Sequence, residues 1–278
     1  MPLRKALTVL LAIAAVAAAG CGDKSYVRTS LGKQHYVEPA VNRISESSDK
    51  RNRDNTASMQ RDLGEILHYL SAGDLDGAKQ RANDLVKRSP DSAAAHTYLA
   101  VALDRSGDKT AAGHHYLRAA ELAPDNGGAL GNYGIWLCGQ GNVAEALTWF
   151  DRALATPEYA DSPVVLANSG ACAGKAGQQQ RAERDLRRAI ALAPENPVAL
   201  AALAQREFGA GNAFEARAFS ERRLAAAPAD PRALLLASQI EQKLGDSAAA
   251  ARYVSRLKAE FPDAPEARNS AMGDGGRQ

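Results

Sequence analysis

A spacing of 34 residues runs through the sequence from residue 59 onward and constrains the fold more than any other feature. An alanine follows each of six glycines by five residues, and a proline follows five of these glycines by 17. Glycine readily ends a helix in a left-handed turn and proline cannot continue one, so each unit predicts two antiparallel helices. The glycines, 34 residues apart except for one interval of 36, are Gly73, Gly107, Gly141, Gly177, Gly211 and Gly245. The six units are 59–92, 93–126, 127–162, 163–196, 197–230 and 231–264.

Small residues complete the pattern. Seven positions before the glycine, five of the six units carry Ala, Gly or Ser, which lets two helices approach closely. The sequence resembles tetratricopeptide repeats in its period of 34 residues and in the positions of its glycines, alanines, prolines and small residues. The resemblance implies an all-α fold, a right-handed superhelical solenoid of six helix-turn-helix repeats over residues 59–264. The first helices of such repeats line a concave groove that holds peptides or partner helices, and each unit depends on its neighbours to bury its apolar face.

The N-terminus has the character of a secretory signal. Arg4 and Lys5 precede an uncharged, mostly apolar run over residues 6–20, which is shorter than the ~20 residues that span a bilayer as a helix. A transmembrane anchor is therefore the weaker alternative. Cys21 follows the small residues of "AAG" directly, and this text resembles a bacterial lipobox. That resemblance implies removal of residues 1–20, lipidation of Cys21 and, since Gly22 rather than Asp comes next, the periplasmic face of the outer membrane.

Both flanks of the repeats are predicted to lack regular secondary structure. Residues 21–58 are polar and mixed in charge, which predicts a lipidated N-terminus and a flexible tether. The stretch 25–39 within it has some apolar residues, so ordering against a partner is the alternative. Residues 265–278 are predicted to be a loose C-terminal tail.

The predicted partner-binding groove starts in unit one. Leu63, Leu67 and Leu70 stand at i, i+4 and i+7 on one helix face, which is equally compatible with a packing face of the terminal unit. Asn132 and Asn168 share one repeat position, where they could bind a peptide backbone or act as polar caps within the stack. The residues that continue the stripe into units two and three are Thr97, Val101 and Ile135.

Cys138 and Cys172 are the two thiols left once Cys21 is lipidated, and we predict a disulfide between them. They occupy positions 12 and 10 of consecutive first helices, and this offset of two residues turns the side chains about 200° apart, so that they face each other. Neighbouring helix axes about 8–10 Å apart allow the bond, and an oxidising periplasm permits it. The alternative is two small buried thiols.

The sequence offers no assembled catalytic, metal or cofactor site. The text "GQGNVA" at 139–144 fits the loose dinucleotide-binding pattern, but that pattern has to follow a strand. Here it follows a predicted helix and coincides with a repeat turn. His114 and His115 are adjacent and have no further metal ligand at a suitable spacing, which predicts a surface pair. The basic run from Arg181 to Arg188 is mixed with acids at helical spacing and is predicted to be a solvated face. We expect neither an enzyme nor a small-molecule substrate.

Charge gives no support for a nucleic-acid partner. The 34 basic and 32 acidic residues become 32 and 32 when Arg4 and Lys5 leave with the signal. The hydrophobic content of 45% is ample for a packed structure, and the low aromatic content of 5% in an Ala-rich text favours helices over a β-sandwich.

Units three and four carry a more specific resemblance. Unit three contains the text Asn-Tyr-Gly and the Pro-Glu-Tyr insertion, and each of the two units contains one Cys. Together with the lipobox and the six repeats, these features resemble the type IV pilus biogenesis and stability lipoproteins, the pilotins of the pilus secretin. This resemblance implies a scaffold that binds the secretin subunit and promotes its localisation and multimerisation in the outer membrane. The alternative is a periplasmic adaptor that organises cell-wall or envelope-assembly enzymes with the same repeats.

Overall fold

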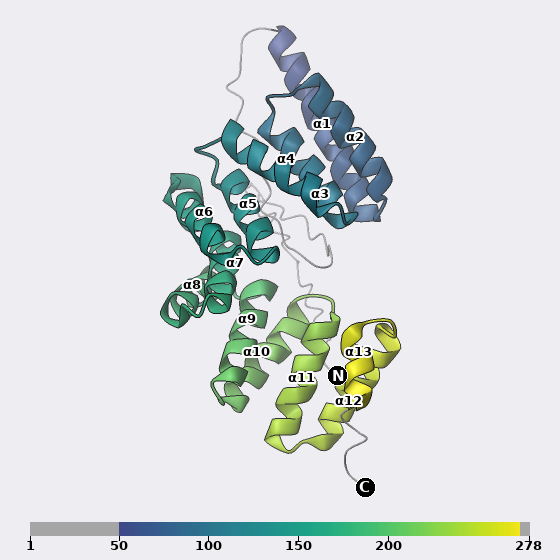
Figure 1. Ribbon diagram of the computed structural model, residues 1–278, viewed down its shortest axis with the longest axis vertical. Coiled ribbons are helices and arrows are strands. Elements are labelled where there is room, and N and C mark those ends of the chain that lie inside the picture. Colours follow the sequence, from purple (N-terminus) through teal and green to yellow (C-terminus); the bar gives the residue numbers. More distant parts are fainter. Residues whose placement is uncertain (1–49, 273–278) are drawn as a thin grey trace, which may run out of the picture.

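The computed structural model describes residues 50–272, which form helices throughout and no β-strand within that range (Figure 1). Each predicted unit is a pair of antiparallel helices, so the expected all-α solenoid of helix pairs is confirmed. The pairs are α1 (Lys50–Ala72) with α2 (Leu75–Arg88), α3 (Ala93–Arg105) with α4 (Lys109–Leu122), α5 (Gly127–Gly139) with α6 (Val143–Ala155), α7 (Pro163–Lys175) with α8 (Gln179–Leu192), α9 (Pro197–Gly209) with α10 (Ala213–Ala226), and α11 (Pro231–Leu244) with α12 (Ser247–Glu260).

The repeat glycines make the turns within the pairs. All six have φ between 73° and 94°, the left-handed region that favours glycine. The second helix then starts at once, and in three units an Asp caps it by accepting a hydrogen bond from the backbone N–H three residues on. These caps are Asp74, Asp108 and Asp246. First helices α7, α9 and α11 begin with proline, whose fixed φ suits the first helical turn.

Small residues bring the two helices of a unit into contact, as predicted. A Cβ atom on Gly134 would lie 3.0 Å from the Phe150 ring, and one on Gly170 would lie 2.7 Å from Cγ of Leu186. The alanines five residues after the repeat glycines are all buried. The close approach of the two helices in a unit therefore depends on residues with no side chain or a short one.

Neighbouring pairs stack in sequence order, from α1 and α2 at one end to α11 and α12 at the other (Figure 1). Each second helix contacts the first helix of the next unit, and the first helices of successive units also contact one another. The first helices thus form the inner layer of the solenoid and the second helices the outer layer. The two-residue insertion of unit three forms a short 3-10 helix, η1 (Pro157–Tyr159), beside the start of α5.

Both ends of the repeat array differ from the prediction. Helix α1 starts at Lys50, so the last part of the predicted tether, 50–58, is helical. The predicted loose tail contains a further helix, α13 (Pro265–Met272), which packs on α11 and α12. Ala267 of α13 is buried against Leu234 and Leu257. The last unit would otherwise expose its apolar face, and α13 covers it as a terminal cap.

Candidate functional site

The predicted groove residues are mostly buried. Leu63 and Leu70 belong to the hydrophobic core, which favours the packing alternative for the leucine stripe of unit one over the contact surface. Only Leu67 and Asn168 of the predicted set are partly exposed. The Asn168 side chain donates to the carbonyl oxygen of Val164 at 2.9 Å, which leaves its amide oxygen as an acceptor. The remaining predicted groove residues, all buried, are Thr97, Val101, Asn132 and Ile135.

Accessible side chains of the inner layer lie instead on α7, α9 and α11. Ala171, Gln205 and Gln239 occupy the repeat position of Val101 and Ile135, yet each is partly or fully exposed. This surface combines amides, small apolar residues and two lysines, and no residue in it is acidic. We define the inner face of units four to six as Asn168, Ala171, Lys175, Ala201, Gln205, Phe208, Leu235, Gln239 and Lys243.

This inner face has the chemistry of a peptide-binding surface. Amide side chains both donate and accept hydrogen bonds, as an extended backbone requires, and alanines allow that backbone to come close. The Lys175 and Lys243 ammonium groups make no ion pair with a described residue. The apolar pattern did not indicate this face, of which only Asn168 was predicted. Its signal in the sequence is the change from Val and Ile to Ala and Gln at one repeat position.

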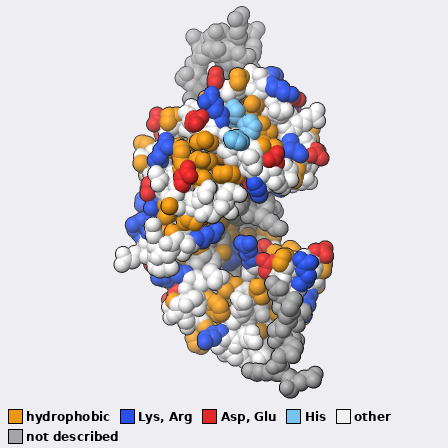
Figure 2. Space-filling view, viewed as in Figure 1, with side chains coloured by type: hydrophobic (Ala, Val, Ile, Leu, Met, Phe, Trp, Pro, Cys, Tyr) orange, Lys and Arg blue, Asp and Glu red, His pale blue; other side chains and the backbone are white. Residues whose placement is uncertain are grey.

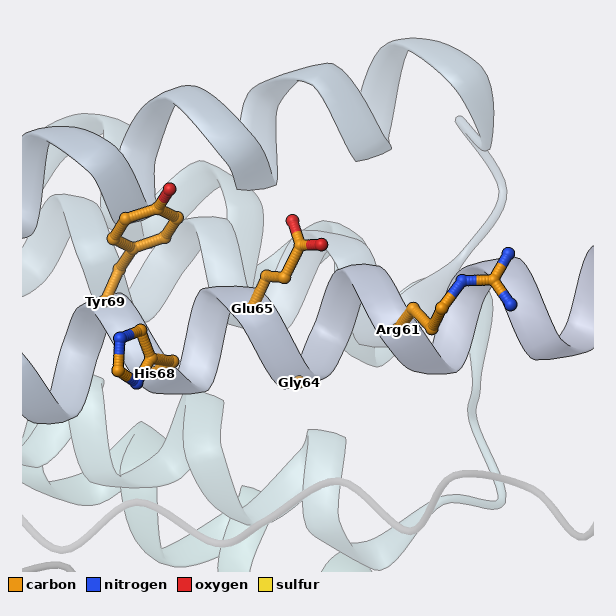
Figure 3. A pocket seen from close by; sticks show the side chains of 5 residues that line it. All are labelled: Arg61, Gly64, Glu65, His68 and Tyr69. Carbon is orange, nitrogen blue, oxygen red and sulfur yellow. The ribbon is translucent and has the colours of Figure 1, made fainter.

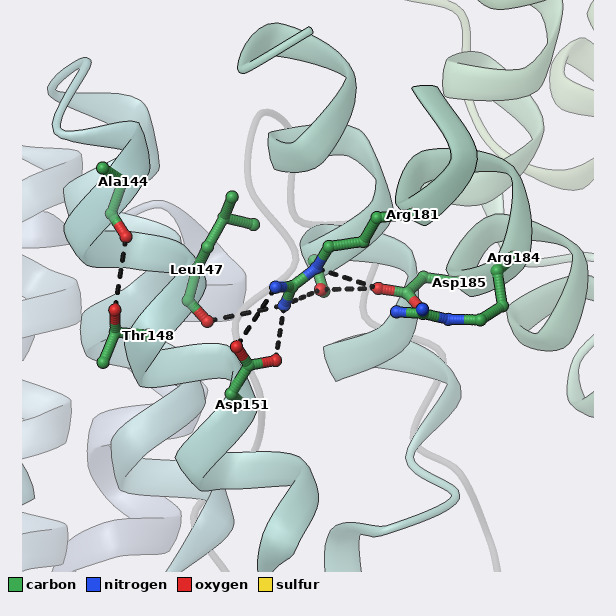
Figure 4. Close-up of polar contacts among 8 residues, drawn as sticks. Ala144, Leu147, Thr148, Asp151, Arg181, Arg184 and Asp185 are labelled. Atoms are coloured by element: carbon green, nitrogen blue, oxygen red, sulfur yellow. Dashed lines mark hydrogen bonds and ion pairs between the residues drawn. The ribbon is translucent and has the colours of Figure 1, made fainter. Parts of the chain in front are cut away.

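The basic run on α8 is exposed at Arg184, Arg187 and Arg188, in keeping with a solvated face, but Arg181 is partly buried and bridges two units (Figure 4). The Arg181 guanidinium reaches Asp151 of α6 at 2.6 Å and also donates to Ser169 of α7 at 3.1 Å. Asp185 is buried, accepts a hydrogen bond from Ser169 at 2.9 Å and pairs with Arg184 at 2.9 Å. These contacts lock unit three to unit four behind the inner face.

A disulfide links the same two units. Cys138 of α5 and Cys172 of α7 are bonded, with Cα atoms 6.0 Å apart, in the pairing expected from their positions in the repeat. Cys172 is fully buried and Cys138 is nearly so. Together with the Arg181 contacts, the bond fixes the junction from which the inner face of units four to six begins.

The adjacent histidines are not a surface pair, which corrects the prediction. His114 is exposed, but His115 is only half-exposed and its ring faces His96 of α3. Burial, with the charges of His96 and His114, lowers the pKa of His115 below its ordinary value of 6.5.

Comparisons with known proteins agree with the fold. The tetratricopeptide-repeat family model matches residues 63–127 and 114–163. Residues 63–163 therefore match the tetratricopeptide-repeat family, and the described chain has the corresponding fold of stacked helix pairs. No curated protein sequence matches it significantly.

Two solved structures of similar size resemble this chain along most of its length. PilW, a widely conserved type IV pilus biogenesis factor, is 28% identical over 76% of this chain and 97% of its own, with a TM-score of 0.65. PilF of Pseudomonas aeruginosa is 23% identical over 80% of this chain and 99% of its own, with a TM-score of 0.64, and shows the shared fold. Cut9, in complex with Hcn1 from the APC/C, has the same fold at 16% identity and a TM-score of 0.66, over 74% of this chain and 41% of its own.

Two depressions on the described part of this chain are open to solvent and do not form enclosed cavities. One depression is lined by five residues of α1 alone, which lie along one stretch of that helix (Figure 3). No group of three metal-ligating side chains occurs within the described residues. The residues lining the depression are Arg61, Gly64, Glu65, His68 and Tyr69.

The predicted membrane anchor falls outside the described residues. Cys21 and the predicted signal, residues 1–20, precede the first described residue. The lipidation of Cys21 and the location of the protein at the outer membrane therefore stay predictions. Among the helices that the structure describes, none is both long and apolar enough to cross a membrane.

Proposed function

We propose that this protein is a pilotin: an outer-membrane lipoprotein scaffold that binds the type IV pilus secretin subunit and promotes its localisation and multimerisation. The likeness to PilW, which extends over 97% of that protein at 28% identity, is the observation that carries the proposal. The lipobox-like text before Cys21, and the motifs of units three and four, support it independently.

The mechanism requires no chemistry on the secretin. A lipid on Cys21 confines the solenoid to the periplasmic face of the outer membrane, and the solenoid confines the secretin segment to the same surface. The effective concentration of subunits rises, and ring assembly follows by mass action. The tether sets how far the repeats stand from the bilayer.

The inner face of units four to six is the proposed contact. Asn168 and Gln205 offer amide groups to an extended segment of the secretin, while Ala171 and Ala201 leave room for its backbone. Acidic side chains are absent from this face, and Lys175 and Lys243 favour a segment with carboxylates of its own. The disulfide and the Arg181 contacts keep the start of this surface rigid.

The first experiment tests the function. Deletion of the gene should abolish secretin multimers, detected as slowly migrating bands on a gel of outer membranes, and the wild-type gene should restore them. Cys21→Ser should restore protein but few multimers, since the scaffold would no longer be held at the membrane. Normal multimers in the deletion strain, with a cell-wall enzyme rather than the secretin copurifying, would favour the adaptor alternative.

The second experiment tests the face. Ala171→Glu places a carboxylate within the proposed contact, and Ala191→Glu places one on the exposed outer side of α8 as a matched control. We expect the first to lose copurification with the secretin and the second to keep it, while circular dichroism shows both folded. Equal binding by the two variants would move the contact elsewhere on the solenoid.

A further inference from the structure

Unit two contains a pair of histidines that neither the repeat nor the proposed function explains. The Nδ1 atoms of His96 on α3 and His115 on α4 lie 2.9 Å apart, and the ring centroids are 5.1 Å apart. His96 is 7% exposed, whereas His115 is half-exposed at the surface. Histidine side chains are visible on the upper part of the face in Figure 2, next to hydrophobic ones.

The surroundings of His96 fix its tautomer. Its Nε2 atom lies 2.9 Å from the carbonyl oxygen of Pro90, in the turn between α2 and α3. A carbonyl oxygen can only accept, so Nε2 carries the hydrogen and Nδ1 of the neutral ring presents a lone pair toward His115. Metal-ligating histidines are held in the same way, with the second ring nitrogen donating to a backbone carbonyl.

We propose that His96 and His115 form a binding site for Cu²⁺ through their two Nδ1 atoms. Two metal–nitrogen bonds of about 2.0 Å at right angles, as in tetragonal Cu²⁺, place the nitrogens about 2.8 Å apart. The spacing of 2.9 Å between the two Nδ1 atoms meets this requirement. Imidazole suits copper, and Cu²⁺ binds such sites more tightly than the other divalent ions of the first transition row.

Binding needs a proton shift within His115 and a small rotation of the two rings, because the centroid distance of 5.1 Å places the two Nδ1 atoms almost head-on. In the metal-free pair one Nδ1–H lies between the rings, and because Nδ1 of His96 is the acceptor, His115 is the donor. When the ion binds, the neutral His115 ring carries its proton on Nε2 instead of Nδ1, so both Nδ1 lone pairs reach the ion and no net proton is lost. No third histidine, cysteine or carboxylate completes the site among the described residues, so water fills the other positions.

The site would join three parts of the fold. The ion would bridge α3 to α4, and the hydrogen bond from His96 would tie it to the turn that connects unit one to unit two. This inference does not depend on the proposed function, because copper binding is measured without the secretin.

The test is a competitive titration of the full chain with Cu²⁺ at pH 7.5. The protein carries Cys21→Ser and no histidine tag, so that neither a free thiol nor a tag binds the ion. His115→Gln removes one ligand at a half-exposed position, and His114→Gln and His68→Gln are matched controls on exposed histidines. We expect one ion per wild-type chain, about tenfold or more weaker binding for His115→Gln, and wild-type binding for both controls.

A second readout does not depend on affinity. Substoichiometric Cu²⁺ should broaden the ring signals of His96 and His115 in nitrogen-15 spectra before those of the other histidines. The proposal is overturned if His115→Gln binds Cu²⁺ as tightly as the wild type, if His114→Gln loses as much affinity as His115→Gln, or if other histidine signals broaden first.

Discussion

Reduction of the disulfide between Cys138 and Cys172 should destabilise the protein strongly. The bond closes a loop with a sequence separation of 34 residues. In the chain-entropy model such a loop contributes about 3.8 kcal/mol to the free energy of unfolding at 25 °C. For a structure of this length, each kcal/mol corresponds to about 2–4 °C in melting temperature, so we expect a fall of about 8–15 °C.

The assay is thermal unfolding followed by circular dichroism, with and without a reductant, after thiol counting on denatured, unreduced protein. Thiol counting should find neither Cys138 nor Cys172 free before reduction. The Cys138→Ala/Cys172→Ala double variant is the control: it should melt near the reduced wild type and should not respond to the reductant. Two free thiols in freshly isolated protein, or a melting temperature that reduction leaves unchanged, would refute the reasoning.

Three further predictions concern helix contacts and titration. Gly170→Ala places a Cβ atom 2.7 Å from Leu186 and should cost about 1–3 kcal/mol of unfolding free energy in urea titrations, whereas Gly174→Ala, whose nearest contact is 3.9 Å away, should cost nothing. Arg181→Met leaves the buried Asp185 with fewer partners and should cost about 1–3 kcal/mol of unfolding free energy. Arg187→Met breaks a partly exposed pair with Glu183 and should cost less than about 1 kcal/mol; equal costs would contradict the bridging role of Arg181. Because the fold lowers the pKa of His115, the unfolded chain takes up this proton first as the pH falls through about 6.5, so stability is lost below that pH. Urea titrations at pH 7.5 and 5.5 should therefore show a larger loss for the wild type than for His115→Gln.

The two ends of the solenoid show where periodicity stops being informative. Residues 265–272 have no repeat signal, and their polar text predicted a loose tail. They form α13 because the last unit presents Leu234 and Leu257 with nothing else to cover them. Helix α1 likewise starts at Lys50, ahead of the first repeat position. Helix α13 caps a surface that exists only once the repeats have stacked.

The sequence by itself determined the units, their turns and their internal packing. Those features act over a few residues: Gly73 and its equivalents take positive φ, and Gly134 and Gly170 let one helix approach the next. The pairing of Cys138 with Cys172 also followed from register, since consecutive first helices must lie side by side.

Only the tertiary structure decided which face of the solenoid is accessible. One repeat position is buried at Val101 and Ile135 but exposed at Gln205, because burial depends on neighbouring units and not on a residue's own helix. The Arg181 bridge and the pair of His96 with His115 were invisible for the same reason: each joins residues 16 to 30 positions apart whose meeting is set by how helices pack. Helical periodicity assigns a side chain to a face, and packing then decides what that face meets.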